Sequence, residues 1–353
     1  MTTRHLIALI PGDGIGREVI PAGVAVLEAA GRRHGIEFGW KEYDWSCDRY
    51  VKTGAMMPDD GLEQIRPSDA ILLGAVGYPG VPDHVSLWGL LLPIRRGFGQ
   101  YACVRPVKLL PGVKTPLAGR TAEDIDFVIV RENNEGEYSR MGGRIYEGTD
   151  AEVVIQEAVF TRRGVDRIIE YAFRLAEKRR GHLTSATKSN GIFHSMPYWD
   201  ERFAAAAARH PRVKTAQYHI DILSAHFVQH PDWLDVVVGS NLFGDILSDL
   251  GAAVAGSIGV APSANVNPER TAPSMFEPVH GSAPDIAGKG VANPVATIWA
   301  AAMMLDHLGH PEAAAAVERA IDTVLSEPRL RTRDLGGSAT TREATDAIVQ
   351  AIS

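Results

Sequence analysis

The sequence predicts an α/β protein with a mostly parallel sheet. Short apolar runs alternate with helical patterns along the whole chain, which is typical of repeated strand–helix–strand units. Polar residues or glycines directly follow each run, as expected where the carboxyl ends of parallel strands gather at one sheet edge. At 353 residues, 45% of them apolar, the chain is long enough that two domains are expected.

Five apolar runs predict buried strands, and they lie at residues 6–10, 70–76, 126–130, 183–187 and 234–238. Helices are expected between them. The clearest has apolar residues at helical spacing between Val165 and Ala176, and Gly181 is a suitable stop.

Three glycines, Gly12, Gly14 and Gly16, follow the first predicted strand. A dinucleotide fingerprint, Gly-x-Gly-x-x-Gly, would need glycine where Arg17 stands. We therefore reject a Rossmann fingerprint and interpret these glycines as a tight strand-to-helix turn.

The composition argues against several classes of protein. The formal net charge of −7 disfavours nucleic acid or an anionic membrane as a partner. Cys47 and Cys103 are the only cysteines, so neither a disulfide framework nor a Cys-ligated zinc site is expected. The first apolar run is too short for a signal peptide, and no run approaches the roughly 20 apolar residues of a membrane span. These features predict a cytoplasmic protein.

The most specific stretch is Asn241-Leu-Phe-Gly-Asp-Ile-Leu-Ser-Asp249, which follows the last predicted strand. In a helix, Asp245 and Asp249 share one face because residues i and i+4 are neighbours. Two like charges at this spacing destabilise a helix unless a cation neutralises them, and hard divalent ions prefer carboxylate oxygens. A metal site and a solvated acidic face are both compatible with this pattern.

Three arginines are considered together. Arg95 and Arg105 flank a helix-to-strand transition, and Arg131 ends the run at 126–130. Guanidinium groups bind carboxylates through paired hydrogen bonds, so three that converge would suit a di- or tricarboxylate. Ordinary surface ion pairing is the alternative, and it fits Arg131 least well because a buried strand precedes it.

Three other residues are candidates for chemistry. Tyr138 lies in a polar loop with little apolar company, which is unusual for a core tyrosine. Lys188 directly follows a buried strand, a position that suits a general base, although most lysines are simply solvated. Asp221 is an acid in an apolar setting, where it could complete a metal site or cap a helix.

A long loop punctuated by glycine and proline spans residues 276–294. Closely spaced Gly281 and Ser282 leave backbone N–H groups free for a phosphate, and an acidic residue can bind a ribose diol. A purely structural Ω-loop is the alternative.

Together these segments resemble the β-decarboxylating dehydrogenases that act on 3-isopropylmalate, isocitrate, homoisocitrate, tartrate and D-malate. The likeness covers nearly the whole chain, with the Gly12–Gly16 turn, the 241–249 stretch and the 280–294 loop as its markers. It implies an isopropylmalate dehydrogenase-like, non-Rossmann, two-domain fold. Residues 1–101 plus 256–353 would form a discontinuous first domain carrying most of the NAD site. Residues 102–255 would form the second, with the metal and catalytic residues and a β-arm near residues 143–161 that interlocks a homodimer.

The resemblance also implies a mechanism shared between two subunits. Asp245, Asp249 and the neighbouring subunit's Asp221 would bind Mn²⁺ or Mg²⁺, which would hold the C1 carboxylate and 2-hydroxyl of the substrate. Lys188, also from the neighbour, would act as base during hydride transfer to NAD, and Tyr138 would protonate the enol after CO₂ leaves. Substrate contacts are implied for Trp88, Leu91, Leu92, Arg95, Arg105, Arg131 and Asp221. Cofactor contacts are implied for Asn190, Glu277, His280, Gly281, Ser282, Ala283, Asp285, Ile286 and Asn293.

Two segments bear on the choice of cofactor and substrate. Asp285-Ile286 stands where NADP-using isocitrate enzymes have Lys-Tyr, and a carboxylate accepts from a free 2′-hydroxyl but repels a 2′-phosphate, so NAD is predicted. Trp88 and the Thr187-Lys-Ser-Asn190 run are similar to the tartrate and D-malate branch, although Trp88 could equally serve core packing. The leucines at 91 and 92 keep 3-isopropylmalate open as a substrate.

The leading hypothesis is therefore oxidative decarboxylation of D-malate, with activity on tartrate. A 3-isopropylmalate dehydrogenase of leucine synthesis is the alternative within the family, and a non-catalytic regulatory homologue is the alternative outside it. Retention of Tyr138, Lys188 and the three aspartates argues against the latter. L-tartrate and meso-tartrate, Mn²⁺ and Mg²⁺, and dimer and tetramer remain alternatives, with K⁺ as a candidate activator.

Overall fold

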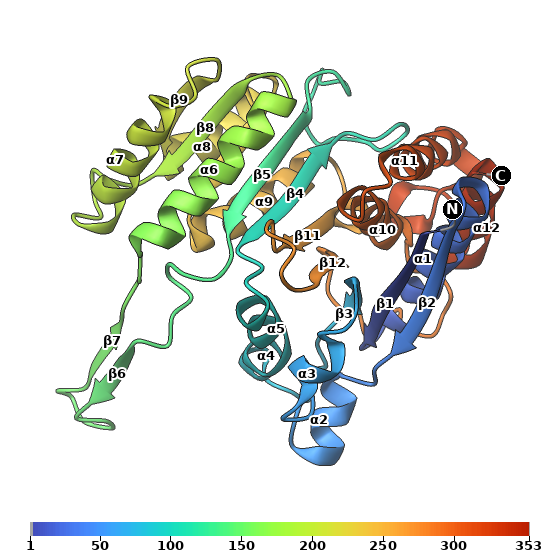
Figure 1. Cartoon of the computed structure of the whole chain (residues 1–353), viewed down its shortest axis with the longest axis horizontal. Helices are drawn as coiled ribbons and strands as arrows, with labels where there is room; N and C mark the ends of the chain where they lie inside the picture. Colours follow the sequence, from blue (N-terminus) through green and yellow to red (C-terminus); the bar gives the residue numbers. More distant parts are fainter. Residues whose placement is uncertain (1–2, 353) are drawn as a thin grey trace.

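The computed structural model describes residues 3–352 and is organised around one ten-stranded sheet (Figure 1). The strand order is β2-β1-β3-β12-β11-β4-β5-β10-β8-β9. Neighbours are parallel except along the strip β12-β11-β4-β5, whose three pairings are antiparallel. The prediction of an α/β fold with a mostly parallel sheet is confirmed.

The strands of this sheet are β1 (Thr3–Gly12), β2 (Ile36–Glu42), β3 (Ala70–Ala75), β4 (Ala102–Lys108), β5 (Asp126–Glu132), β8 (His182–Thr187), β9 (Lys214–His219), β10 (Val236–Gly239), β11 (Pro262–Val266) and β12 (Ser274–Pro278). The helices are α1 (Gly16–His34), α2 (Cys47–Thr53), α3 (Gly61–Ile65), α4 (Asp83–Ser86), α5 (Leu92–Gly97), α6 (Arg162–Lys178), α7 (Ser195–Ala207), α8 (Ile220–Gln229), α9 (Asn241–Val254), α10 (Val295–His307), α11 (Pro311–Ser326) and α12 (Thr341–Ile352). A π-helical turn, Leu87–Leu91, joins α4 to α5.

The five predicted strands correspond to β1, β3, β5, β8 and β10. Helix α6 buries the predicted stripe from Val165 to Ala176 against β5, β10 and β8. Gly181 has φ +75° and donates to the carbonyl of Ala176, so it terminates the helix as expected.

The two main hydrophobic cores of residues 3–352 lie against the sheet. The larger is packed by α1, α10 and α11 at one end and by α6 to α9 at the other (Figure 1). The smaller joins the opposite side of β1 and β3 to residues from the α2–α5 region, with Trp45, Ile94 and Phe98 among its buried members.

The turn after β1 fits closely against the loop that follows β12. Gly14 has φ +51°, and a Cβ there would lie 2.0 Å from the carbonyl oxygen of Ser282. The N–H of Ile15 donates to that same oxygen at 2.9 Å. Glycine is therefore required for the close approach, as expected for a tight strand-to-helix turn.

A two-stranded antiparallel hairpin, β6 (Gly142–Ile145) and β7 (Val153–Gln156), extends away from the body (Figure 1). Its apolar side chains are exposed, including Ile145, Tyr146, Val154 and Ile155 at 49% or more. The predicted β-arm is therefore present, and its apolar surface lies open in the single chain.

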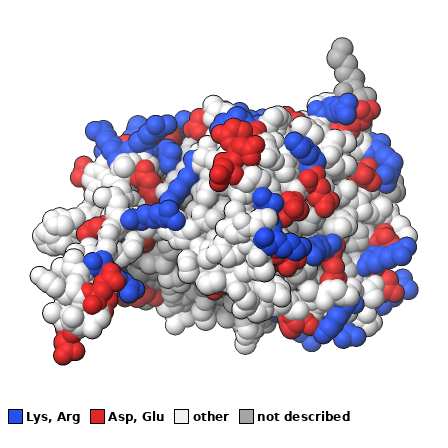
Figure 2. Space-filling model, turned by 90° about the horizontal axis from the view of Figure 1, so that it is seen from below, with Lys and Arg blue, Asp and Glu red and all other residues white. Residues whose placement is uncertain are grey.

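Acidic and basic side chains are interspersed over the face shown in Figure 2, with no single-sign field covering it. No helix within residues 3–352 combines the length and apolar character that crossing a bilayer requires.

Candidate active site

A small cavity of about 210 Å³, here called the arginine-lined cavity, lies where β3, β4, β5, α9 and the end of β12 meet. The predicted site residues that line it are Leu91, Arg95, Arg105, Arg131, Tyr138, Asp245, Glu277 and His280. The fold thus brings together residues from widely separated parts of the sequence. Its volume is below the roughly 300–1,000 Å³ of pockets for drug-sized ligands, which suits a small acid.

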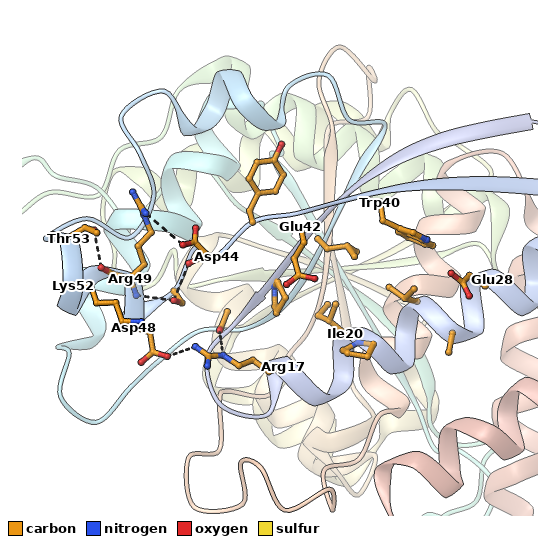
Figure 3. Close-up of a pocket in the computed structure, with 18 residues that line it drawn as sticks. Arg17, Ile20, Glu28, Trp40, Glu42, Asp44, Asp48, Arg49, Lys52 and Thr53 are labelled. Atoms are coloured by element: carbon orange, nitrogen blue, oxygen red, sulfur yellow. Dashed lines mark hydrogen bonds and ion pairs between the residues drawn. The ribbon is translucent and has the colours of Figure 1, made fainter.

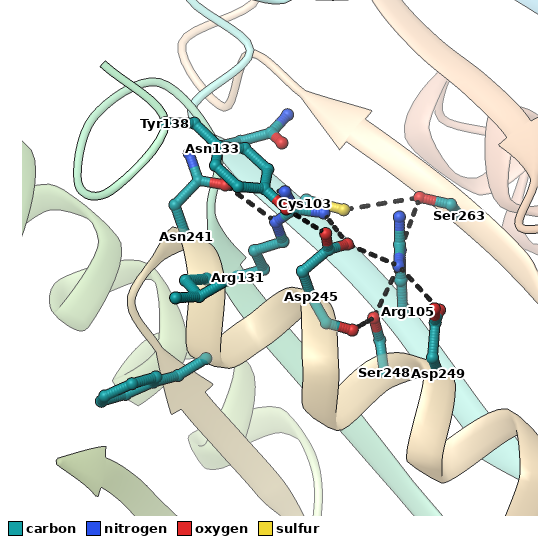
Figure 4. A network of polar contacts seen from close by, with 12 residues as sticks. Cys103, Arg105, Arg131, Asn133, Tyr138, Asn241, Asp245, Ser248, Asp249 and Ser263 are labelled. Atoms are coloured by element: carbon teal, nitrogen blue, oxygen red, sulfur yellow. Dashed lines mark hydrogen bonds and ion pairs between the residues drawn. The ribbon is translucent and has the colours of Figure 1, made fainter. Parts of the chain in front are cut away.

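Arg131, Tyr138 and Asp245 form the centre of this cavity (Figure 4). Arg131, at the end of β5, donates to Asp245 and also, through Nε and Nη2, to Asn241 Oδ1 at 3.0 and 2.7 Å. The Tyr138 hydroxyl donates to Asp245 Oδ2 at 2.6 Å. Gly244 makes this packing possible, because a Cβ there would lie 2.5 Å from the Cβ of Arg131.

Arg105 lies beside the two aspartates of α9. It is 3.5 Å from Asp245 and 3.7 Å from Asp249, and it donates to the hydroxyls of Ser248 and Ser263 (Figure 4). Asp245 and Asp249 therefore share one helix face, as predicted, and a protein cation lies close to both. The Asp249 side chain keeps 66% of its surface exposed, so its oxygens remain available to a metal ion.

Burial and neighbouring charges shift the pKa values of three ionisable groups at this site. Burial raises the pKa of the Tyr138 hydroxyl to about 12, helped by its hydrogen bond to Asp245, so the phenol stays protonated near neutral pH. Burial would raise the pKa of Asp245, but Arg131 and Arg105 outweigh it and hold that pKa below its usual range. Burial raises the pKa of Asp249, against the pull of Arg105.

Two buried nitrogens that belong to cavity-lining residues lack hydrogen-bond partners in the described chain. Arg95 pairs with Glu277 at 2.7 Å through one terminal nitrogen, while its Nε has no acceptor. His280 Nε2 likewise has no partner, and burial lowers the pKa of this imidazole. The Arg95 Nε–H is a donor, which fits an anionic ligand that supplies an acceptor. His280 Nδ1 faces the carbonyl oxygen of Gly281 at 3.0 Å and therefore carries the ring proton, so Nε2 of the neutral imidazole is an acceptor, which fits a ligand hydroxyl or amide.

The loop after β12 carries most of the predicted cofactor residues. Among residues 3–352, the N–H groups of Gly281, Ser282 and Ala283 have no acceptor, which fits phosphate oxygens. Ala283 has φ +40°, a conformation that is strained for a residue with a side chain. Asp285 is exposed, and Ile286 packs beside Ile15. Asn293 donates to Asp334 at 2.9 Å and accepts from the N–H of Val295 at the start of α10.

Lys188, Asn190 and Asp221 do not reach the arginine-lined cavity of the same chain. Lys188 Nζ instead donates to Asp221 Oδ1 at 2.8 Å, and Asn190 is exposed just after β8. Within the described residues, no three His, Cys, Asp or Glu side chains lie close enough to hold a metal ion. One chain therefore offers two of the three predicted carboxylate ligands in one place.

Two predicted substrate residues also lie off the cavity. The centroid of the Trp88 ring lies 4.9 Å from the guanidinium carbon of Arg96 and 4.6 Å from that of Arg140. Leu92 is buried at 1% exposure. Leu87, one helical turn before Leu91, lines the cavity and was missed. The i, i+4 spacing of these two leucines was the available signal.

A larger cavity of about 790 Å³ lies between α1, β2 and α2 (Figure 3). None of the predicted site residues lines it. Among its lining residues, Arg17 pairs with Asp48, and Arg49 lies 4.0 Å from Asp44. The larger cavity thus lacks the predicted catalytic residues, whereas the arginine-lined cavity brings eight predicted site residues together. The arginine-lined cavity is therefore the candidate active site.

Comparison with known proteins identifies close relatives. The chain is 59% identical to D-malate dehydrogenase [decarboxylating] from Escherichia coli (strain K12), with 98% of each chain covered. It is 58% identical to tartrate dehydrogenase/decarboxylase from Pseudomonas putida, covering 97% of this chain and 96% of that protein. The fold matches isocitrate dehydrogenase from Methylococcus capsulatus with a TM-score of 0.88 and 37% identity, over 99% of both chains.

The family description "Isocitrate/isopropylmalate dehydrogenase" matches residues 6–351, which is nearly the whole chain. This match agrees with the full-length relatives and with the fold. The protein is therefore an enzyme of the isocitrate/isopropylmalate dehydrogenase family.

Proposed function

We propose that this enzyme catalyses the NAD- and Mn²⁺- or Mg²⁺-dependent oxidative decarboxylation of D-malate to pyruvate and CO₂, with activity on tartrate. The observation that carries the proposal is that three arginines, Tyr138 and Asp245 line one small cavity, where Arg105, Arg131 and Tyr138 contact Asp245. The relatives named for D-malate and tartrate, at 58–59% identity over the full length, support the choice of substrate class.

The residues of the site have different proposed roles in the reaction. Arg95, Arg105 and Arg131 bind the carboxylate that departs as CO₂, and the free Arg95 Nε supplies a donor for it. Tyr138, held protonated, delivers its proton to the carbon from which CO₂ has left. Asp245 and Asp249 would hold a divalent cation, which would supply polarisation of the 2-hydroxyl, and bound NAD would supply the acceptor for the hydride from C2.

We propose that the site is completed by a second subunit. The partner subunit's Lys188 serves as the base for the 2-hydroxyl proton, and the partner subunit's Asp221 is the third carboxylate ligand. Two observations support this arrangement: the in-chain pair of Lys188 and Asp221 lies away from Asp245, and the β6–β7 arm exposes apolar side chains. The homodimer, with domains of residues 1–101 plus 256–353 and 102–255, is part of this proposal.

The NAD site is proposed along the loop after β12. The free N–H groups of Gly281, Ser282 and Ala283 would bind the pyrophosphate, and exposed Asp285 would accept from the ribose diol. A cytoplasmic location is also proposed, in keeping with Cys47 and Cys103, which are free and buried.

The test is NADH formation, followed at 340 nm, with Mn²⁺ and K⁺ across D-malate, L-tartrate, meso-tartrate, 3-isopropylmalate and isocitrate. The highest kcat/KM is expected for D-malate or a tartrate. Preference for 3-isopropylmalate by tenfold or more would show instead that Leu87 and Leu91, which line the cavity, select a branched substrate. No turnover of any of these acids would contradict the proposal.

A further inference from the structure

We propose that Glu137 is a positioning residue that holds the Tyr138 hydroxyl against Asp245. The inference rests on the proposed function for the role of Tyr138, while its geometry stands independently. Glu137 directly precedes Tyr138 in the loop between β5 and the arm, and its carboxylate faces α9, the helix that carries Asp245.

The Glu137 carboxylate binds the first turn of α9 through both oxygens. Its Oε1 accepts from the Ser240 hydroxyl at 2.8 Å, and its Oε2 accepts from the backbone N–H of Leu242 at 3.0 Å. Helix α9 has no acidic residue of its own in the first turn, so this carboxylate supplies the negative charge that a helix N-terminus favours.

The next residue makes the second attachment. Tyr138 reaches further along the same helix, where its hydroxyl donates to Asp245 Oδ2 at 2.6 Å. Two adjacent residues of one loop therefore hold two successive turns of α9. Asn241 adds a third link, because its amide donates to the carbonyl of Glu135 at 2.8 Å.

These contacts stabilise helix α9, and they also set the position of the Tyr138 hydroxyl. A phenol that must deliver a proton to one carbon needs a defined position, and small displacements of such groups cost rate steeply. The bond from Glu137 to Leu242 fixes where the loop sits along α9, and so where the Tyr138 ring can lie relative to Asp245.

A double-mutant cycle separates positioning from mere stabilisation. If Glu137 acts through Tyr138, Glu137→Ala lowers kcat for D-malate about tenfold in the native background and by less than about twofold in a Tyr138→Phe background. The melting temperature falls by a similar amount in both backgrounds. Glu137→Gln, which keeps the shape and one acceptor, retains an intermediate kcat, and the KM for NAD stays unchanged in all variants.

A matched control comes from another helix N-terminus. Glu343 accepts from the N–H and hydroxyl of Thr340 at the start of α12, which packs on α1 and α11. Glu343→Gln weakens a carboxylate cap in the same way as Glu137→Gln. It should lower the melting temperature without changing kcat.

A second readout needs no turnover. Nitration of Tyr138 by tetranitromethane, mapped by mass spectrometry, reports the exposed phenolate. We expect it to be slow in the native enzyme and in Glu343→Gln, and several-fold faster in Glu137→Ala and Glu137→Gln. Equal losses of kcat in both backgrounds, or unchanged nitration of Tyr138, would overturn the positioning role. If the native enzyme turns over none of the acids, the proposed function fails, while nitration still decides the role of Glu137.

Discussion

Lys188 Nζ donates to Asp221 Oδ1 at 2.8 Å, so the expected base and the expected third metal ligand are held together in one chain. Lys188 follows β8, and Asp221 lies in the first turn of α8, which follows the neighbouring strand β9. The Lys188 hydrogen bond is the largest influence on the Asp221 carboxyl and lowers its pKa. The pair is therefore a preformed unit that one subunit can present to another.

Hybrid dimers should reveal a shared site. Lys188→Ala and Tyr138→Phe should each lower kcat by about 10²–10⁴-fold, because each removes a proton-transfer group. Mixing the two variants under conditions of subunit exchange should restore about one quarter of native activity, since half the dimers are hybrids with one intact site each. Activity that does not rise on mixing, although native mass spectrometry detects hybrids, would place Lys188 in its own chain's site.

The arm should be required for association. Val154 is 61% exposed on β7, and Val154→Asp puts a charge into a surface that we expect to be buried between subunits. The variant should shift toward monomer in light scattering and lose activity in parallel. Val154→Ile, which keeps the apolar surface, should remain dimeric, and a dimeric Val154→Asp would contradict this role.

Cofactor preference should respond to two loop residues. Asp285 is exposed, where its charge would repel a 2′-phosphate. The double variant Asp285→Lys with Ile286→Tyr should lower kcat/KM for NAD and raise it for NADP by at least tenfold each. Steady-state kinetics with both cofactors at fixed D-malate checks this, and an unchanged ratio would show that other residues read the 2′ position.

Glu132 should make stability depend on pH. Burial raises the pKa of this carboxyl to about 7, although the N–H groups of Glu135 and Asn134 and the Arg167 guanidinium, 3.7 Å away, oppose the rise. The folded state therefore holds a proton that the unfolded state releases above about pH 4.5. The resulting stabilisation is present in full below pH 4.5 and is lost as pH rises toward 7. It amounts to something on the order of 3 kcal/mol.

Glu132→Gln cannot ionise, so its free energy of unfolding should vary less between pH 5 and 8 than that of the native enzyme. Relative to the native enzyme, the variant should gain stability as pH rises. Denaturant unfolding at pH 5, 6, 7 and 8 measures this difference. Parallel curves would mean that Glu132 does not titrate in this range.

Position 244 should not tolerate any residue larger than glycine. Its hypothetical Cβ would lie 2.5 Å from the Cβ of Arg131, so Gly244→Ala should displace the guanidinium that reaches Asp245. We expect destabilisation of about 1–3 kcal/mol and a loss of kcat/KM for D-malate. Gly251→Ala, on the same helix but beside the core side chains of Val107 and Ile129 instead of a cavity residue, should lower stability with little change in kcat/KM.

The sequence predicted what depends on local spacing. Asp245 and Asp249 lie on one face because a helix follows β10, and the apolar stripe of α6 is buried as its period indicates. The strand β4 was anticipated only as a helix-to-strand transition between Arg95 and Arg105. The strand β11 was not predicted, because it contains Pro262 and depends on antiparallel pairing across the sheet.

The side-chain contacts of the site were harder to foresee. Arg95 meets Glu277 across 182 positions of sequence, and Glu137 meets Leu242 across 105. No periodic pattern encodes such pairs, since they arise from how distant strands align. The contacts of Trp88 were equally hard to predict, because the tertiary fold brings Arg96 and Arg140 to its ring.

The sheet also decides how the molecule could be divided. Strand β4 is hydrogen-bonded to β11 on one side and to β5 on the other, so the strip joins the two proposed domains along their backbones. A recombinant fragment of residues 102–255 would carry β4 with one edge open, and such an edge recruits foreign strands. Neither proposed domain should therefore fold well when it is expressed alone. In chimaeras with relatives, β11, β4 and β5 should all come from the same parent protein.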